Sequence, residues 1–184
     1  MEKVIFLDRD GTLNEEVNYL HRKEDLVLLP GVPEALKVVV TNQAGVARGY
    51  YTEDDVKELH RYMNELLAGQ GVKIDAFYYC PHHPEHGIGK YKVRCHCRKP
   101  ETGMFEMAEQ DFAVDKASSW MIGDKLIDME AGRNYGVRTV LVGTGYGAGV
   151  HEEQKKKGDF PYDLYADDLL EAYNEINRET AGNL

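Results

Sequence analysis

The sequence predicts an α/β fold in which a Rossmann-like parallel β-sheet is covered by helices on both faces. Two observations predict it. Apolar, β-branched runs of strand length alternate with helical patterns, and several of these runs end in polar residues. Strands buried on both faces of a parallel sheet have continuous apolar sequences. In such sheets, ligands bind beyond the carboxyl ends of the strands.

Five segments have the composition of strands in this sheet. They span residues 4–8, 37–42, 74–79, 119–124 and 138–142. The first ends in Asp8, the second in Thr41 and Asn42, and the fourth in Asp124. Because the carboxyl ends of parallel strands lie along one edge of the sheet, we expect these polar side chains to meet there.

Four helices are expected around these strands. Thr52 is a favourable N-cap residue, acidic residues follow it where the helix macrodipole favours negative charge, and Gly69 marks the end of the helix. Thr102 is expected to cap the second helix in the same way. The remaining helices are expected over 102–112, over 125–134 with its end near Gly136, and over 167–177.

Two stretches depart from this pattern. Residues 143–160 are rich in glycine and charge, so we expect a mobile surface loop there. The segment from Gly31 to Lys37 begins like a helix, with Pro33 in the first turn, but only about one turn precedes the next strand. Mean helices run to about 11 residues. Either this crossover helix is unusually short or residues are absent from the sequence.

Length and composition indicate a single soluble domain. The chain has 184 residues, of which 42% are apolar, enough for a sizeable core. A net charge of −10 argues against general binding to nucleic acids or anionic membranes, but a few local cations suffice for a phosphorylated substrate. The apolar run near the N-terminus is too short for a signal peptide or a membrane span. We therefore expect a cytoplasmic protein.

Two carboxylates follow the first strand. Asp8 and Asp10 are two residues apart, so in an extended chain their side chains point the same way, and Gly11 permits a tight turn after them. Such a pair can hold an oxygen-preferring cation such as Mg²⁺, or divide the work of nucleophile and acid/base catalyst. On its own, however, Asp-x-Asp-Gly is more often a polar turn.

Three cysteines and four histidines lie close together in residues 80–97. An odd number of cysteines does not suit a disulfide framework, whereas zinc is commonly held by three cysteines and one histidine. The fourth ligand has four candidates: His82, His83, His86 and His96. His82 is favoured because Cys80-x-His82 then faces Cys95-x-Cys97. Four protein ligands leave no open position, so the zinc is expected to be structural and to pin the loop.

Four motifs in order make the chemistry specific. They are Asp8-Arg9-Asp10-Gly11-Thr12 after the first strand, Thr41 at the end of the second, Lys99 in Arg-Lys-Pro, and Gly123-Asp124-Lys125-x-x-Asp128. Together they resemble the motifs of the haloacid dehalogenase-type phosphohydrolases. The resemblance implies a Mg²⁺-dependent phosphatase in which Asp8 accepts the phosphoryl group as an aspartyl-phosphate.

The resemblance gives each motif residue a role. It implies that Mg²⁺ is held by Asp8, Asp124 and a backbone oxygen of Asp10. Asp10 protonates the leaving alcohol and then activates water. Thr41 donates hydrogen bonds to phosphoryl oxygens, and Lys99 balances the charge of the transition state. Asp128 either supports the water shell of the metal or is an acid on the surface of a helix.

Most of the chain resembles one branch of that superfamily. Similarity to the D-glycero-D-manno-heptose 1,7-bisphosphate 7-phosphatases is carried by segments 8–14, 41–49, 78–84, 95–100 and 123–128. This family has a zinc-bound loop in place of a large cap domain, and its compactness implies a monomer. The resemblance therefore implies one phosphatase domain over residues 1–184, with a zinc-binding loop at about 80–97, that removes the 7-phosphate of a small sugar bisphosphate.

Compared position by position, the family implies a set of substrate-binding residues. They are Arg9, Glu16, Val17, Asn18, Tyr19, Thr41, Asn42, Gln43, Ala44, Arg98, Lys99 and Lys125. Arg98 carries a fork of donors that could hold the distant 1-phosphate. Ala44 stands where many family members have serine, which removes a hydroxyl from the rim of the pocket.

Two other functions are weighed against this one. A histidinol-phosphate phosphatase has the same chemistry and a different pocket, so the rates of phosphate release from the two substrates distinguish them. A zinc-stabilised binding module without catalysis belongs to another class of function. It is opposed by the presence of Asp8, Asp10, Lys99 and Asp124.

Overall fold

A computed structural model describes residues 1–32 and 36–182, and within them six strands form one sheet in which all neighbouring strands are parallel. The strands are β1 (Val4–Leu7), β2 (Leu36–Asn42), β3 (Ala76–Cys80), β4 (Trp120–Gly123), β5 (Arg138–Val142) and β6 (Leu164–Ala166). Their order is β3-β2-β1-β4-β5-β6. The predicted α/β fold class is therefore confirmed.

β1 lies at the centre of the sheet because its side chains are apolar on both faces. All four of its residues are fully buried. Phe6 pairs in register with Val38 of β2 on one side and with Met121 of β4 on the other. The chain therefore leaves β1 in one direction to form β2 and β3, and returns to the other side to form β4.

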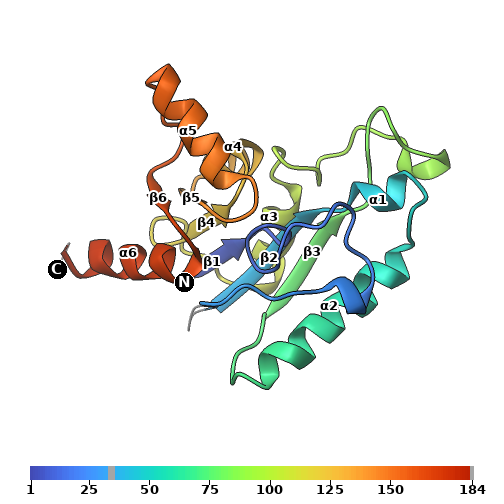
Figure 1. Cartoon of the computed structure of the whole chain (residues 1–184), viewed down its shortest axis with the longest axis horizontal. Coiled ribbons are helices and arrows are strands. Elements are labelled where there is room, and N and C mark those ends of the chain that lie inside the picture. The colour runs from blue at the N-terminus through green and yellow to red at the C-terminus, as the bar shows by residue number, and fades with distance from the viewer. Residues whose placement is uncertain (33–35, 183–184) are drawn as a thin grey trace.

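Helices cover both faces of the sheet, as expected (Figure 1). On one face α2 (Glu53–Ala68) and α6 (Leu169–Gly182) pack side chains such as Met63 and Ile176 against the core. On the other face α3 (Gly103–Asp111) and α4 (Leu126–Tyr135) contribute Phe105 and Tyr135. The other helical elements are the short η1 (Lys23–Asp25), α1 (Ala44–Ala47) and η2 (Gly89–Tyr91), and the longer α5 (Gly147–Lys157).

Two helix ends follow the predicted capping residues, whereas the predicted Thr102 cap is wrong. The Thr52 hydroxyl accepts from the Asp55 N–H, and the Asp55 carboxylate accepts from the Thr52 N–H, so α2 begins with a capping box. α4 ends at Gly136, whose φ of 97° is the left-handed conformation that favours glycine. Thr102 occupies the N-cap position of α3, but its hydroxyl donates to Glu106 instead of capping the helix.

The prediction of a mobile loop over residues 143–160 is wrong, because α5 occupies most of this stretch. A Cβ at Gly147 would lie 1.6 Å from the Val142 carbonyl oxygen, so glycine there serves close packing of the helix start on β5 rather than flexibility. Gly158, with a φ of 67°, ends the helix after three lysines. β6, which has only three residues, was not expected from the sequence.

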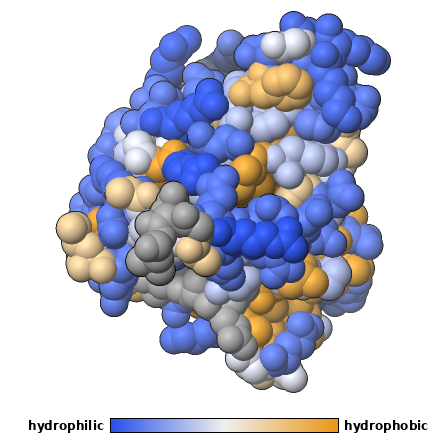
Figure 2. Space-filling view, turned by 90° about the vertical axis from the view of Figure 1, so that its left-hand side faces the viewer, coloured by the Kyte–Doolittle hydropathy of each residue, from blue (hydrophilic) through white to orange (hydrophobic). Residues whose placement is uncertain are grey.

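The crossover between Gly31 and Lys37 falls largely on residues 33–35, which lie outside the described residues, and β2 begins directly after them. Within residues 1–32 and 36–182, none of the helices combines the length and apolarity that a bilayer span needs. Figure 2 shows that the face carrying both termini is mainly hydrophilic, with apolar residues in small separate groups.

Candidate active site

A pocket of about 330 Å³ opens where β1, β2 and β4 end, the point at which the strand order reverses. It combines acidic, basic, amide and aromatic side chains. Its lining consists of Asp8, Asp10, Glu16, Asn18, Tyr19, Thr41, Asn42, Gln43, Ala44, Tyr51, Arg98, Lys99, Lys125, Ile127, Asp128 and Tyr146. The strand-end residues Asp8, Thr41 and Asn42 therefore meet in one pocket, as the sequence predicts.

Lys99 is buried at the base of this pocket, between two carboxylates. Its Nζ lies 2.9 Å from Asp8 Oδ1 and 2.7 Å from Asp128 Oδ1, and it donates to the Val40 carbonyl at 2.7 Å. Burial alone would lower the pKa of Lys99, but the charges of Asp128 and Asp8 outweigh burial and raise it. Lys99 is therefore a fixed positive charge at the end of β1.

Amide side chains hold this arrangement from the β2 side. The Asn42 side chain forms two hydrogen bonds with the Lys99 backbone. It donates to the Lys99 carbonyl at 3.2 Å and accepts from the Lys99 N–H at 3.0 Å. Gln43 donates to the Thr41 hydroxyl at 2.9 Å and accepts from the Tyr51 hydroxyl at 2.8 Å. Thr41 is thus oriented by a chain of hydrogen bonds that begins at Tyr51.

The carboxylate of Asp10 is held by three donors. Arg9 lies 3.0 Å from Asp10 Oδ2, and Asn14 and Gln43 donate to the same carboxylate at 3.1 and 3.3 Å. Burial would raise the pKa of Asp10, but the charge of Arg9 and these hydrogen bonds together lower it. Asp8 and Asp10 therefore have different surroundings, which suits two different roles.

Asp124 is buried beneath a turn that only glycine permits. Gly11 has a φ of 80°, and a Cβ there would lie 2.2 Å from Asp124 Oδ2. Gly145 has a φ of 56°, and its Cβ would lie 2.3 Å from the same oxygen. The Tyr146 N–H donates to Asp124 at 3.0 Å, and Lys125 Nζ lies 3.0 Å from Asp124 and 3.1 Å from Glu16. The loop after β5 therefore closes over the carboxylate.

Three acidic residues could hold a cation here. One carboxylate oxygen from each of Asp8, Asp124 and Asp128 lies within 4.8 Å of the others. Burial and the charge of Asp8 raise the pKa of Asp124 to about 6, and the same causes raise the pKa of Asp128. A divalent cation would offset this repulsion, and carboxylate oxygens are the ligands that Mg²⁺ prefers. The donor set therefore fits Mg²⁺, and the buried position of Asp128 shows that it is not a surface acid.

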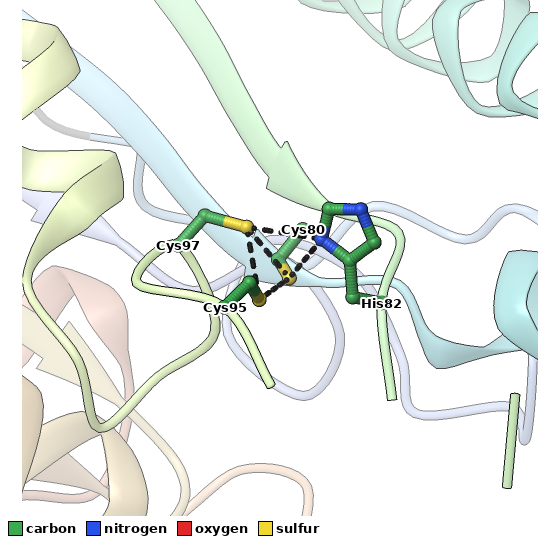
Figure 3. Close-up of side chains that lie close together, drawn as sticks. All are labelled: Cys80, His82, Cys95 and Cys97. Carbon is green, nitrogen blue, oxygen red and sulfur yellow. Dashed lines mark hydrogen bonds between the residues drawn. The ribbon is translucent and has the colours of Figure 1, made fainter. Parts of the chain in front are cut away.

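A second group of metal-binding side chains lies in the loop between β3 and α3. Figure 3 shows Cys80, His82, Cys95 and Cys97 converging, with Cys80 at the end of β3. The Cys97 Sγ lies 3.0 Å from that of Cys80 and 3.2 Å from that of Cys95, and 3.4 Å from His82 Nδ1. Contact with Cys80 lowers the pKa of Cys97, and the thiolate is the form that binds metals. Three sulfurs and one imidazole fit tetrahedral Zn²⁺.

The other histidines of this loop lie outside the sulfur cluster. His96 points to Glu106 and bonds its carboxylate at 2.9 Å. His83 accepts from the backbone N–H groups of Glu85 and His86. Burial, followed by the charges of Arg98, His86 and Arg48, lowers the pKa of His83.

The loop is attached to the pocket and to α2. Arg98, in the pocket lining, donates to the His82 carbonyl at 3.2 Å. The Tyr79 and Tyr91 hydroxyls donate to opposite oxygens of Glu53, at 2.7 and 2.8 Å, which ties the loop to the start of α2. A metal ion held by the four-residue cluster would therefore stabilise the segment that carries Arg98.

Several known proteins are similar to this chain in sequence. A family described as HAD-hydrolase-like matches residues 96–172. The D-glycero-beta-D-manno-heptose-1,7-bisphosphate 7-phosphatase of Haemophilus ducreyi is 46% identical over 169 residues, covering 86% of this chain and 91% of that protein. The D-glycero-alpha-D-manno-heptose-1,7-bisphosphate 7-phosphatase of Burkholderia mallei is 45% identical, covering 76% and 79%.

The chain belongs to the D-glycero-D-manno-heptose 1,7-bisphosphate 7-phosphatase family. Within this family, a crystal structure of D,D-heptose 1,7-bisphosphate phosphatase from B. bronchiseptica, complexed with magnesium and phosphate, superposes with a TM-score of 0.79. The two are 30% identical, and the match covers 96% of this chain and 99% of that one.

Two of the residues expected to contact the substrate lie elsewhere. Arg9 is fully buried behind Asp10, where it also donates to the Leu20 carbonyl, and its side chain is not in the lining of the described pocket. Val17 packs against the hydrophobic core. The structure adds Tyr51, Ile127 and Tyr146 to the lining. Tyr51 reaches the site through its hydrogen bond to Gln43, and Tyr146 through the loop after β5 that closes over Asp124. Neither tyrosine belongs to the motifs that predicted the site.

Proposed function

We propose that this protein is a Mg²⁺-dependent phosphatase that removes the 7-phosphate of D-glycero-D-manno-heptose 1,7-bisphosphate through an aspartyl-phosphate on Asp8. The observation that carries the proposal is the contact of Lys99 with Asp8 at 2.9 Å, in a pocket that also contains Asp10 and Thr41. Membership of the heptose-bisphosphate phosphatase family supports the substrate.

In the first step, the Asp8 carboxylate attacks phosphorus and a P–O bond to Asp8 forms. The bond from phosphorus to the sugar oxygen breaks, and that oxygen takes the proton of Asp10. In the free protein the pKa of Asp10 is lowered, so Asp10 must take up a proton from solvent when the substrate binds. The bound phosphate dianion makes this protonation possible, because negative charge beside Asp10 raises the pKa of its carboxyl.

In the second step, Asp10 is a carboxylate and can take a proton from water. The water oxygen attacks phosphorus, the bond to Asp8 breaks, and Asp8 leaves as a carboxylate. Lys99 offsets negative charge on Asp8 and on the phosphoryl group in both steps. Thr41, oriented by Gln43, donates to a phosphoryl oxygen.

The two metals have different parts in this proposal. Mg²⁺, held by Asp8, Asp124 and the backbone of Asp10, would supply charge neutralisation that lets a carboxylate approach a phosphate dianion. Asp128 is placed to support that site and to fix Lys99. Zn²⁺ on Cys80, His82, Cys95 and Cys97 would be structural, because all four ligands come from the protein.

The substrate residues of the proposal are those that line the pocket around this centre. Glu16, Asn18, Tyr19 and Lys125 would contact the sugar, and Arg98 the second phosphate. Arg9 acts instead as a positioning residue for Asp10, and any contact of its backbone with the substrate stays a prediction. One phosphatase domain over residues 1–184, a monomeric state and a cytoplasmic location are further parts of the proposal.

The experiment compares phosphate release from three substrates at equal concentration, with and without Mg²⁺. They are the α and β anomers of the heptose bisphosphate and histidinol phosphate. We expect Mg²⁺-dependent turnover that is fastest with one of the two anomers, and none in the Asp8→Asn variant, which should keep its fold. Faster turnover of histidinol phosphate than of either anomer would refute the proposed substrate.

A further inference from the structure

Arg9 connects the general acid of the proposed mechanism to the interior of the fold. Its side chain is fully buried, and its Nε and Nη2 lie 3.1 and 3.0 Å from the two carboxylate oxygens of Asp10. Nη2 also donates to the Leu20 carbonyl at 3.1 Å. A fork of donors that bonds both oxygens fixes the plane of a carboxylate as well as its position. The orientation of Asp10 therefore depends on what holds Arg9.

The remaining nitrogen of this guanidinium is held by a histidine from α2. Arg9 Nη1 lies 3.4 Å from His60 Nε2, its one hydrogen-bonding partner among the described residues. Arginine offers only donors, so His60 Nε2 must be the acceptor and the proton of the neutral ring lies on Nδ1. Burial, and then the charge of Arg9, hold the pKa of His60 well below its ordinary value. His60 is therefore a neutral acceptor for Arg9.

The ring of His60 is itself fixed by packing. His60 is 5% exposed, and its ring stacks on that of Phe77 in β3, with centroids 4.4 Å apart and an angle of 16° between the planes. The ring of Tyr79 lies edge-on, with its centroid 6.1 Å away. A ring held between a helix and a strand cannot follow a moving guanidinium, so it gives Arg9 a rigid anchor.

His60 is separated from the substrate. It is not in the lining of the active-site pocket, and instead lines a second cavity of about 360 Å³ beside α2 and β3. The charged side chains in the lining of that cavity are Lys57, Arg61 and Asp75. Within the described part of the chain, none of these three forms a hydrogen bond with the ring. Arg9 is therefore the group through which His60 can influence the reaction.

We propose that His60 is a positioning residue that acts through Arg9 to hold the Asp10 carboxylate in the orientation for proton transfer. The inference rests on the proposed function, in which Asp10 gives a proton to the sugar oxygen and later takes one from water. Without the acceptor on His60, Arg9 Nη1 is a buried donor with no partner, and the guanidinium gains by turning towards another acceptor. Asp10 turns with it, so proton transfer slows while substrate binding does not change.

The test compares kcat and KM of wild type, His60→Leu and His60→Gln with heptose 1,7-bisphosphate and Mg²⁺. Leucine has a similar volume and no acceptor, whereas the side-chain oxygen of glutamine can take the place of Nε2. In His60→Leu we expect kcat to fall by about 10-fold to 100-fold, with KM within about twofold of wild type. The loss is partial because Asn14 and Gln43 still hold Asp10. The kcat of His60→Gln should stay within about threefold of wild type.

A second substrate separates a loss of proton transfer from general damage to the site. 4-Nitrophenolate is a stable anion that leaves phosphorus without a proton. The value of kcat/KM for 4-nitrophenyl phosphate therefore reports attack by Asp8 without help from an acid. In His60→Leu this value should stay within about twofold of wild type, while kcat/KM for the heptose bisphosphate falls. Equal losses on the two substrates would overturn the inference, since a purely structural histidine predicts that result.

Met63→Ala is the matched control, because Met63 is a fully buried residue of the same helix that packs in the hydrophobic core. It should lower the melting temperature but leave kcat within about twofold of wild type. Thermal melting of every variant sets an assay temperature at which all of them are folded. His60→Leu with the kcat of wild type, or His60→Gln as slow as His60→Leu, would also overturn the inference.

The two proposals fail in different ways. Wild type that turns over histidinol phosphate faster than either heptose anomer would refute the proposed substrate, while a fall of kcat in His60→Leu on histidinol phosphate would still support the role of His60. Wild type specific for the heptose bisphosphate, together with an unimpaired His60→Leu, would refute the role of His60 alone.

Discussion

Replacement of Lys99 by methionine tests how the site is held together. The side chain is 1% exposed, and its ammonium lies 2.9 Å from Asp8 and 2.7 Å from Asp128. At an effective dielectric constant of about 20, each contact is worth about 6 kcal/mol before the cost of burial is subtracted. Removal of one partner from a buried ion pair costs about 3–5 kcal/mol of folding free energy, because the other charges stay buried.

The expected loss depends on pH, and its sign follows from Asp128. Burial and the charge of Asp8 already raise the pKa of Asp128, and loss of Lys99 raises it further. A carboxyl whose folded pKa lies above its unfolded value destabilises the fold as pH rises through the folded pKa. The deficit of Lys99→Met relative to wild type should therefore be largest at pH 8 and shrink towards pH 5.

Urea denaturation at pH 8 and pH 5 measures this deficit, and phosphate release measures activity. We expect kcat to fall by about 10²-fold to 10³-fold. Adding Asp128→Asn to Lys99→Met should restore part of the stability, because it removes one unpaired charge. Lys23→Met, which breaks an exposed ion pair with Glu58, is the matched control and should leave the midpoint almost unchanged. A small deficit that does not vary with pH would refute the reasoning.

Three further predictions concern the metal cluster, the glycine turn and a buried histidine. Elemental analysis should find one zinc per chain in wild type and in His96→Ala but none in Cys97→Ala, and zinc retained by Cys97→Ala would exclude the predicted ligand set. Gly145→Ala should displace Asp124 and reduce kcat/KM by about 10²-fold, whereas Gly149→Ala, with open space around it, should not; equal activities would contradict the packing. Burial, then the charge of Arg9, lowers the pKa of His60, so stability should fall by up to about 1.4 kcal/mol per pH unit below about pH 6.5. Urea titrations of His60→Gln should lack this component of the slope, and an unchanged slope would rule it out.

The central strands and the acids that follow them could be predicted from the sequence. Val4 to Leu7 form an apolar run with no polar interruption, which suits a short strand buried on both faces. Asp8 comes directly after it, and the strand order then places Asp8 beside Thr41. These predictions needed only local patterns and one general rule about parallel sheets.

Sequence patterns predict less where tertiary packing decides the conformation. The glycines of residues 143–160 suggested a loop, yet Gly147 allows α5 to approach β5 closely. Arg9 is next to the nucleophile in sequence, but it turns inward to bond Asp10. In a tight turn, neighbouring side chains diverge, and sequence spacing does not show which of them faces the pocket.

The proposed phosphatase activity depends most directly on Asp8 as the residue that accepts the phosphoryl group. The decisive measurement is a rapid acid quench of the enzyme during turnover of heptose 1,7-bisphosphate with Mg²⁺, followed by mass spectrometry of its peptides. We predict one added phosphoryl group on the peptide that contains Asp8, and none on that peptide in Asp8→Asn. Turnover by Asp8→Asn at a rate close to that of wild type would contradict this role of Asp8.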